Sequence, residues 1–580
     1  MARPRPGIVS PSVAGWRRRA PTLAWLPAAG LAFLVMVVSG TWALRDHTSP
    51  QWDQAHYLYL SWVYQQTLDH HGPIALIRAV YTTDPSRAPL LTWLMVPLSY
   101  VFGPGPGAGL ALNVLLWPVL LLSAGAVAKE LFGERARLPA MVVLAPMPLL
   151  VWASSTVLQD FLLVTLVTLG AWALIRTRRF TSRRACLGLG LVVALGMLAK
   201  FDYLVALSGP VIVTIVASTA RTAGSARETS RRRAVRVPLT NLGLTVLVAG
   251  VPTALWYVPS WGPTYAYLRR QVEPLAGAVT DPLSPGHVAS FLLSNGAGVS
   301  WLAVLIAAAV ALASLPRFVR WLRPRPDGTS RADALLVAAF VVSWLLIPLL
   351  VVAANVNRTP RYAAPGYPAL AVIVGGLIAG LGVTVVRRAA IAAAALAMLT
   401  QTLQANVPGY APPLLPAFIH FTTPAGAVTL RFSGPDGFAA PPVATDYTLS
   451  IEQYLESLGR PGGHRPLKVA ILENEANANV NDLGYYALVR HDRFIFKVLL
   501  AAASPGALIE ELRSYDVALY VSPPPAGSAA AVGQVAVLNR ETAATQMTPA
   551  AFNVFRPDPA RFHVGANAGQ SPYLEVLLRR

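Results

Sequence analysis

The run "ALLVAAFVVSWLLIPLLVV" (334–352) contains nineteen consecutive residues without a charged side chain. A helix of this length spans the roughly 30 Å of hydrocarbon in a bilayer. Similar runs recur throughout the first 405 residues. Over the whole chain of 580 residues, 54% of side chains are hydrophobic and only 13% are charged. Because a soluble domain carries about 25% charged residues, the sequence predicts a polytopic α-helical membrane protein.

We expect about eleven membrane-spanning helices from the apolar runs. They lie near 22–44, 107–128, 138–154, 161–175, 185–199, 203–218, 237–258, 290–315, 334–352, 363–385 and 389–405. The shorter apolar segment 88–103 contains two prolines, and we expect it to lie along the membrane surface rather than cross it. The predicted transmembrane domain is therefore 22–405, preceded by a basic cytoplasmic tail at 1–21.

The basic residues are distributed unevenly between alternate loops. With a cytoplasmic N-terminus, 26 Lys and Arg side chains face the cytoplasm and 8 lie in the opposite loops. This positive-inside asymmetry predicts a first extracytoplasmic loop at 45–106 and an extracytoplasmic region at 406–580. The net charge of +20 belongs to the cytoplasmic loops, so it gives no reason to expect a nucleic-acid partner. The Ala-, Arg- and Pro-rich composition suggests a bacterial inner (plasma) membrane.

The region 406–580 has the pattern of a small α/β domain. Strands are expected at 467–473, 493–500 and 516–522, with a helix at 505–515. The segment "ENEANANVND" (473–482) follows the first of these strands, a place where open α/β sheets bind ligands. Glu473 and Asp482 are therefore candidate acceptor-binding residues, and a solvated Asn-rich turn is the alternative.

Charged residues stand at the outer ends of the predicted spans. They are Asp53, Asp160, Lys200, Arg358 and Arg361. Each by itself could anchor a helix at the membrane surface. As a group, the two carboxylates and three cations could form a site for an acidic lipid headgroup, with a carboxylate as base and cations on a phosphate. No charged residue lies inside a predicted span, which disfavours a transporter that relays ions through the membrane.

Four stretches carry a family resemblance. They are "WDQAHY" (52–57), "STVLQDFLLV" (155–164), "GMLAKFDYL" (196–204) and "NRTPRYAAPGYPAL" (357–370). In order and spacing they resemble motifs of the GT-C membrane glycosyltransferases, in the branch of the protein O-mannosyltransferases and the lipid A aminoarabinose transferases. The resemblance covers roughly residues 20–405. It implies an inverting enzyme that moves a sugar from a polyprenyl phosphate to a hydroxyl of a protein, glycolipid or polysaccharide acceptor.

The resemblance also implies roles for individual residues. Asp53 is similar to the catalytic carboxylate, and Asp160 to a second acid that orients the acceptor or the base. The implied ligands of the donor phosphate are Arg87, in "SRAPLL" (86–91), with Lys200, Arg358 and Arg361. The implied lining of the substrate pocket is Gln54, His56, Tyr57 and Tyr362, although a role in an interfacial aromatic belt is open for the two tyrosines.

The sequence departs from the family at two positions. Gln54 stands where the mannosyltransferases often have a second acid, and Ser86 stands where the aminoarabinose transferases have a metal-binding carboxylate. A divalent metal cofactor stays an option, but the spacing of the histidines matches no metal motif. Two other functions also stay open: a lipid-linked sugar flippase or transporter, and a noncatalytic membrane protein that binds polysaccharide.

Overall fold

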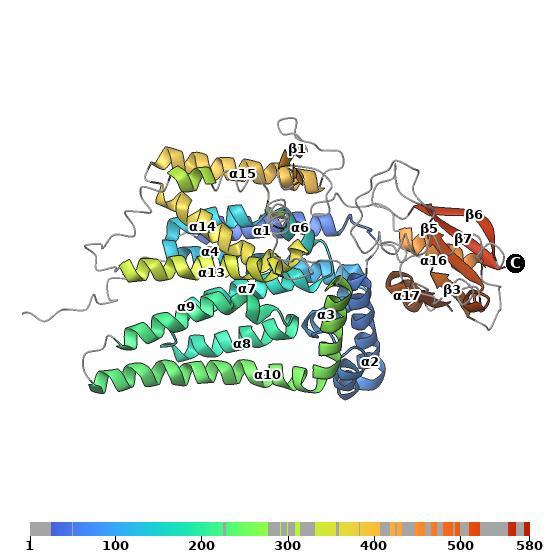
Figure 1. Ribbon diagram of the computed structural model, residues 1–580, viewed down its shortest axis with the longest axis horizontal. Helices are drawn as coiled ribbons and strands as arrows, with labels where there is room; N and C mark the ends of the chain where they lie inside the picture. The colour runs from blue at the N-terminus through green and yellow to red at the C-terminus, as the bar shows by residue number, and fades with distance from the viewer. Residues whose placement is uncertain are drawn as a thin grey trace, which may run out of the picture.

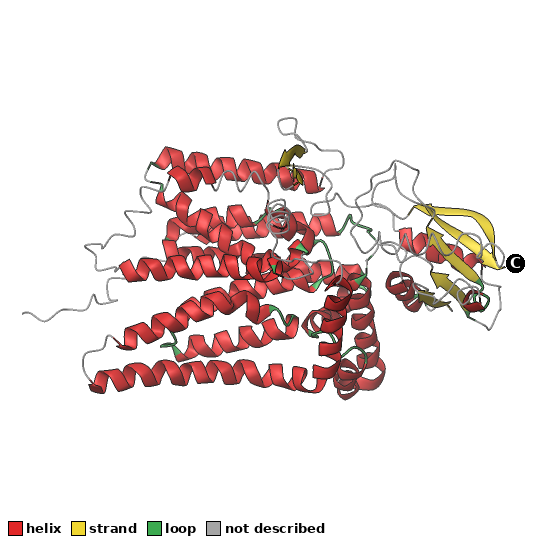
Figure 2. Ribbon diagram, viewed as in Figure 1, coloured by secondary structure: helices red, strands yellow, loops and turns green. Residues whose placement is uncertain are grey.

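A computed structural model gives the architecture of the chain (Figure 1). The structure describes residues 25–48, 50, 52–223, 228–276, 291, 298–299, 308–313, 331–354, 359–381, 383–406, 418–423, 426–431, 447–458, 466–471, 480–490, 494–498, 510–521, 555–563 and 573–579. Most of the described chain is helical. The described strands all lie beyond residue 417, and most of them gather past one end of the helices (Figure 2).

The helices that precede the strands form a bundle of roughly parallel and antiparallel rods (Figure 1). In chain order they are α1 (Leu26–Ala43), α2 (Asp53–Thr82), α3 (Leu90–Phe102), α4 (Pro106–Phe132), α5 (Glu134–Leu144), α6 (Pro148–Ser154), α7 (Gln159–Arg176), α8 (Arg183–Ala199), α9 (Tyr203–Ala223), α10 (Glu228–Ala276), α13 (Arg331–Ala353), η3 (Pro360–Gly366), α14 (Tyr367–Gly380) and α15 (Thr384–Asn406).

Ten of the eleven predicted spans coincide with described helices, and the predicted span 290–315 lies largely outside the described residues. Among the described helical segments, seven are long and apolar enough to cross a membrane, and an eighth is present if a bent pair counts as one span. The protein is therefore a multi-pass membrane protein, as the sequence predicts.

The bent pair corrects the expectation of one continuous span at 138–154. The helices α5 and α6 meet at an angle of 70°. The break falls in "LAPMPLL" (144–150), where Pro146 and Pro148 follow each other closely. A proline removes a backbone donor and disfavours helical geometry in the residue before it, so two prolines in this spacing end one helix and begin another.

The segment between α1 and α4 forms a separate pair of helices at one end of the bundle (Figure 1). The helix α2 is kinked at Gly72, whose φ of 79° suits glycine, and Pro73 follows at the kink. The helix α3 has 13 residues and is therefore about 20 Å long, too short to cross the hydrocarbon core. It matches the surface helix expected at 88–103.

The C-terminal region contains a five-stranded mixed sheet in the order β4-β3-β5-β7-β6. Its strands are β3 (Leu467–Ile471), β4 (Phe494–Val498), β5 (Val517–Val521), β6 (Phe555–His563) and β7 (Tyr573–Arg579). The predicted strands are β3, β4 and β5, which pair in parallel, while β7 is antiparallel to its neighbours. Of the helix predicted at 505–515, the structure describes only residues 510–515. Within them, residues 510–512 are helical.

The remaining elements after residue 406 are a hairpin and two helices. The hairpin is formed by β1 (Phe418–Thr423) and β2 (Gly426–Arg431). The helices are α16 (Tyr447–Leu458) and α17 (Val480–Val489). The sequence did not predict the hairpin or the pair β6–β7. Figure 1 shows α17 beside α2. A hydrogen bond between Asp482 of α17 and Trp52, directly before α2, connects the sheet region to the helical bundle.

Candidate functional site

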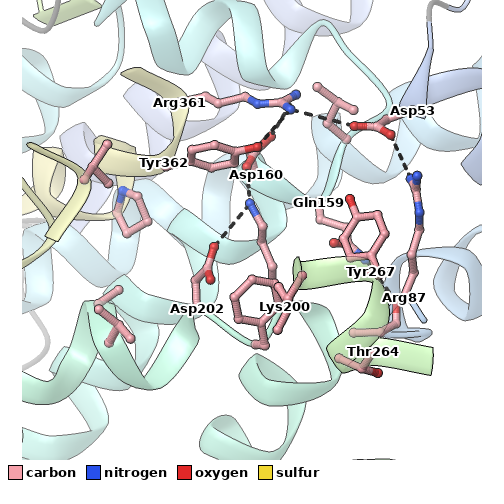
Figure 3. A pocket seen from close by; sticks show the side chains of 18 of the residues that line it. Asp53, Arg87, Gln159, Asp160, Lys200, Asp202, Thr264, Tyr267, Arg361 and Tyr362 are labelled. Atoms are coloured by element: carbon pink, nitrogen blue, oxygen red, sulfur yellow. Dashed lines mark hydrogen bonds and ion pairs between the residues drawn. The ribbon is translucent and has the colours of Figure 1, made fainter. Parts of the chain in front are cut away.

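A cavity of about 240 Å³ lies where several helix ends converge (Figure 3). The first turns of α2 and α7 contribute to it, together with the loops that precede α3 and α9, the later part of α10, the end of α13, and η3. Its charged lining residues are Asp53, Arg87, Asp160, Lys200, Asp202 and Arg361. Segments more than 300 residues apart in sequence thus place their charges in one small volume.

Charges of alternating sign follow one another along the cavity wall (Figure 3). Arg87 Nη1 lies 2.9 Å from Asp53 Oδ1, and Arg361 Nη2 lies 3.7 Å from Asp53 Oδ2. The second terminal nitrogen of Arg361, Nη1, is 3.8 Å from Asp160 Oδ2. Lys200 Nζ is 2.9 Å from Asp160 Oδ1. Each of these two carboxylates is therefore held between two cations.

Local structure explains how the two carboxylates reach the cavity. Asp53 and Asp160 both lie in the first turn of a helix, α2 and α7 respectively, where the helix dipole favours a negative charge. Tyr57 follows Asp53 by four residues, so both side chains lie on the same face of α2. Both residues line the cavity.

Lys200 follows α8 directly, and its extended backbone ends that helix. Its side chain is only 12% exposed. Burial by itself would lower the pKa of Lys200, but the carboxylates of Asp160 and Asp202 outweigh this and raise the pKa above its ordinary value. The ammonium group also lies 4.4 Å from the centre of the Tyr362 ring, a cation–π arrangement. Lys200 is therefore held in its charged form.

Asp202 extends the series of charges. Its carboxylate lies 3.5 Å from Lys200 Nζ, and its side chain is 32% exposed. Burial raises the pKa of Asp202 above its usual value, with a further contribution from the Asp160 carboxylate and an opposing one from Lys200. The environment of Asp202 therefore favours its protonated form.

Arg361 has unused hydrogen-bonding capacity. Its Nε is buried and has no hydrogen-bond partner among the described residues. Its ion pairs with Asp53 and Asp160 are long. Its Nη2 donates a hydrogen bond of 3.3 Å to the Tyr362 hydroxyl, and the Tyr362 ring centre lies 5.1 Å from the guanidinium carbon. A guanidinium presents five N–H donors and binds phosphate in a fork. Arg361 can therefore accept an additional anion without the loss of a short contact.

Arg87 is supported from the side away from Asp53. Its Nε lies 3.6 Å from Asp84 Oδ2, and the same carboxylate oxygen is 2.7 Å from His56 Nε2. The rings of Tyr57 and Tyr267 both lie 5.3 Å from the guanidinium carbon. The position of the guanidinium is thus set by a carboxylate and two aromatic faces.

Asp84→Asn is expected to lower the free energy of unfolding by about 2 kcal/mol, because a hydrogen-bonded charge with several partners is lost. Burial alone would raise the pKa of Asp84, but the hydrogen bonds from His56 and Ser86 lower it to about 2. The stabilisation is therefore complete above the ordinary value of 3.8 and is lost as the pH falls toward 2.

Thermal unfolding of both proteins in detergent would measure this effect. The difference between their midpoints should be present at pH 7 and should shrink as the pH falls below about 4. Equal midpoints at pH 7 would show that Asp84 does not stabilise the loop before α3.

Comparisons with known proteins concern the family and the fold of the chain. A family model described as dolichyl-phosphate-mannose-protein mannosyltransferase matches residues 86–256. ArnT from Cupriavidus metallidurans bound to undecaprenyl phosphate is 13% identical, with 96% of this chain and 98% of that chain covered and a TM-score of 0.53. The chain has the fold of a GT-C membrane glycosyltransferase. The apo structure of the same ArnT gives 12% identity, the same coverage and a TM-score of 0.50.

Further comparisons add little to the GT-C assignment. The apo oligosaccharyltransferase of Archaeoglobus fulgidus is 11% identical, with 87% of this chain and 70% of that chain covered and a TM-score of 0.48. No curated protein matches the chain by sequence. Family model and fold together indicate a glycosyltransferase, in agreement with the resemblance seen in the sequence.

Within this GT-C fold, most predicted site residues meet in the one cavity. Those that line it are Asp53, Tyr57, Arg87, Asp160, Lys200, Arg361 and Tyr362. Arg358 and Glu473 lie outside the described residues. The predicted roles of all these residues stay predictions, because the structure gives their positions alone.

Three predicted site residues do not line the cavity. Gln54 and His56 lie on other faces of α2 than Asp53 and Tyr57, since successive helical residues point about 100° apart. Gln54 Oε1 accepts a hydrogen bond from the backbone N–H of Val157, and His56 pairs with Asp84. Asp482 is fully buried and accepts a hydrogen bond from the backbone N–H of Trp52.

Sequence reasoning missed Asp84, Asp202 and Tyr267. Asp202 stands two residues after Lys200 in the quoted motif "GMLAKFDYL", and its charge at a span end was a usable signal. Asp84 lies in the same loop as Arg87. Tyr267 lies nine residues beyond the end of a predicted span, and nothing in the sequence connects it with Arg87. The described residues contain no group of three or more His, Cys, Asp or Glu side chains that could hold a metal ion.

Proposed function

We propose that this protein is an inverting glycosyltransferase that uses a polyprenyl-phosphate-linked sugar as donor and an acceptor hydroxyl at the extracytoplasmic membrane face. The observation that carries the proposal is the mixed lining of the cavity. Three cations and three carboxylates line it together with apolar residues from two membrane helices. A charged headgroup on an apolar chain has the same mixed chemistry.

Part of the apolar lining of the cavity belongs to α9 and α13. Val205 and Ala206 come from α9, and Val351 and Val352 come from α13. Val205 and Val351 are well exposed, so this apolar lining continues onto the outer surface of the bundle. A polyprenyl chain could therefore lie against these helices while its phosphate reaches the cations. The neighbouring ArnT structure holds undecaprenyl phosphate, which supports this class of donor.

The cations are suited to the leaving group of the reaction. When the bond between the sugar carbon and the phosphate oxygen breaks, negative charge grows on the polyprenyl phosphate. Fixed cations in a site of low polarity stabilise that charge strongly. Lys200 and Arg361 are held in place by Asp160, and Arg87 is held by Asp84 and two aromatic rings. We therefore assign the phosphate to these three cations.

Asp53 is the carboxylate suited to act as the base. Its side chain is one third exposed in the cavity, whereas that of Asp160 is only 5% exposed and is held by Lys200 and Arg361. The acceptor oxygen would attack the sugar carbon from the face opposite the phosphate, and Asp53 would take the acceptor proton as the new bond forms. A single displacement of this kind inverts the sugar carbon.

The arrangement of loop charges supports the proposed orientation. Arg179, from the loop between α7 and α8, pairs with Asp333 near the start of α13, and Arg176 pairs with Glu130 at the end of α4. These segments are all predicted to be cytoplasmic. The cavity joins segments that are all predicted to be extracytoplasmic. The contact of α17 with Trp52 supports an extracytoplasmic C-terminal region as well.

Transfer from purified polyprenyl phosphate sugars, with mannose and arabinose among the donors, tests the proposal. The full chain in detergent should release polyprenyl phosphate and form a glycosylated acceptor with inverted configuration. Movement of the intact lipid between leaflets of a proteoliposome without transfer would favour a flippase. Binding of polysaccharide without either activity would favour a noncatalytic protein.

Donor binding gives a prediction for Arg361. Arg361→Lys keeps the charge but removes the planar fork, so we expect about tenfold weaker binding of undecaprenyl phosphate, which corresponds to about 1.4 kcal/mol. Titration of the lipid in detergent, followed by intrinsic fluorescence or calorimetry, would measure the dissociation constant.

The matched control for this experiment is Arg176→Lys. Arg176 is an exposed arginine whose partner, Glu130, lies outside the cavity, and its replacement should leave the affinity unchanged. Equal affinities for wild type and Arg361→Lys would remove Arg361 from the phosphate site.

A further inference from the structure

The residue before the proposed base has an unusual backbone. Trp52 immediately precedes α2 and has φ of 48° and ψ of −108°. A positive φ is uncommon for a bulky side chain and persists only where the surrounding structure imposes it. Trp52 is followed directly by Asp53, so whatever holds the Trp52 backbone also sets the direction in which α2 begins.

Two consecutive residues of α17 hold this backbone. Asp482 Oδ1 accepts a hydrogen bond of 3.0 Å from the Trp52 N–H, and Asn481 Nδ2 donates one of 3.4 Å to the Trp52 carbonyl oxygen. The side chain of Asp482 is fully buried. The N-terminus of α2 has no side-chain cap from Trp52 itself. A carboxylate from the C-terminal region therefore accepts from the N–H of the N-cap residue, the donor that the third helical residue satisfies in a capping box.

The helix α17 is fixed to the bundle at a second point. The hydroxyl of Tyr485 donates to the carbonyl oxygen of Pro104, in the turn between α3 and α4. Tyr485 is 2% exposed and belongs to the same buried apolar cluster as Ala55 and Leu58 of α2. The contact with Trp52 is thus made by a helix that is packed against the bundle. A substitution of Tyr485 would weaken this packing without a change in the two residues that contact Trp52.

We propose that Asp482 is a positioning residue for transfer: it holds the Trp52 backbone and thereby directs Asp53 into the cavity. Asp53 receives its two ion pairs, from Arg87 and Arg361, at the far end of its side chain. Asp482 fixes the backbone of the residue that directly precedes Asp53. This proposal rests on the proposed function, in which Asp53 is the base. It assigns the C-terminal region a part in catalysis through the geometry of the site.

Three variants of the full chain test this role. Asp482→Ala removes the acceptor of the Trp52 N–H, whereas Asp482→Asn keeps an oxygen at the same place. Tyr485→Phe disturbs the docking of α17 but leaves both contacts to Trp52. Hydrogen–deuterium exchange of the peptide that contains Trp52 reports the contact without any need for activity. Steady-state kinetics with the polyprenyl phosphate sugar report its effect on transfer.

For Asp482→Ala we expect faster exchange of the Trp52 peptide and a fall in kcat of about 10- to 100-fold, because small displacements of a reacting group are costly. The KM for the donor should stay within about twofold, since the phosphate ligands are untouched. Asp482→Asn should recover most of kcat and of the exchange protection. In Tyr485→Phe, kcat and the exchange protection of the Trp52 peptide should both stay near the wild-type values.

Other results would overturn the proposal. An unchanged exchange rate in Asp482→Ala would show that the carboxylate does not hold Trp52. Equal losses of kcat in Asp482→Ala, Asp482→Asn and Tyr485→Phe would show that only the docking of α17 matters. If wild type transfers no sugar at all, the proposed function fails, while the exchange experiment still decides separately whether Asp482 holds Trp52.

Discussion

Asp53→Asn is expected to lower the rate of sugar transfer by a factor of about 10³, because an amide cannot take the acceptor proton. Asparagine keeps the size of the side chain and one oxygen that can accept a hydrogen bond from Arg87. The side chain of Asp53 is 33% exposed, so the loss of its charge should have little effect on folding. Single-turnover transfer with the donor in excess would measure the chemical step.

Asp69→Asn is the matched control for this experiment. Asp69 lies on the same helix, α2, but its carboxylate accepts a hydrogen bond from the exposed Tyr100 hydroxyl and does not line the cavity. Its replacement should leave the transfer rate within about twofold of wild type. The dissociation constant for undecaprenyl phosphate should not weaken in Asp53→Asn, because the cations remain. An Asp53→Asn protein that keeps more than a tenth of the rate would exclude Asp53 as the base.

The charged lining of the cavity could be predicted in part because it follows from topology. Residues at the outer ends of membrane spans are confined to one face of the membrane, and in a small bundle they lie close to one another. Asp53, Asp160 and Lys200 are such residues, and the structure brings them together. Which cation forms an ion pair with which carboxylate could not be predicted, since it depends on the depth at which each side chain enters the bundle.

Proline explains two differences between the expected and observed folds. Pro146 and Pro148 indicate the break between α5 and α6. Hydropathy alone does not indicate it, because both prolines lie within an apolar run. The strand β6 contains Pro557 and Pro559 and has an irregular register between Pro557 and Arg561. Prolines argue against a strand unless it lies at an edge, and β6 is the edge strand of its sheet.

The contact between Asp482 and Trp52 could not be predicted from the sequence. The two residues are 430 positions apart, and an aspartate in an Asn-rich segment has the appearance of a solvated turn. What distinguishes Asp482 is its complete burial, which depends on the docking of α17. Tertiary contacts of this kind carry no local signal, whereas the period and length of an apolar run do.

Lys200→Met is expected to destabilise the protein by about 3 to 5 kcal/mol, because it leaves a buried carboxylate without its closest cation. Asp160 is 5% exposed, and its remaining ion pair, with Arg361, is 3.8 Å long. Transfer should fall by a factor of about 10² or more as well, since one of the cations assigned to the leaving phosphate is lost. Thermal unfolding and single-turnover transfer would measure the two effects.

The double variant Asp160→Asn with Lys200→Met separates the two roles of the pair. Removal of both charges should recover much of the lost stability, because no unpaired buried charge remains. Transfer should stay low, since methionine cannot stabilise the departing phosphate. If the double variant regained transfer together with stability, Lys200 would serve only to balance Asp160, and the phosphate would have to be bound by Arg87 and Arg361. A Lys200→Met protein as stable as wild type would show that Asp160 does not need its cation.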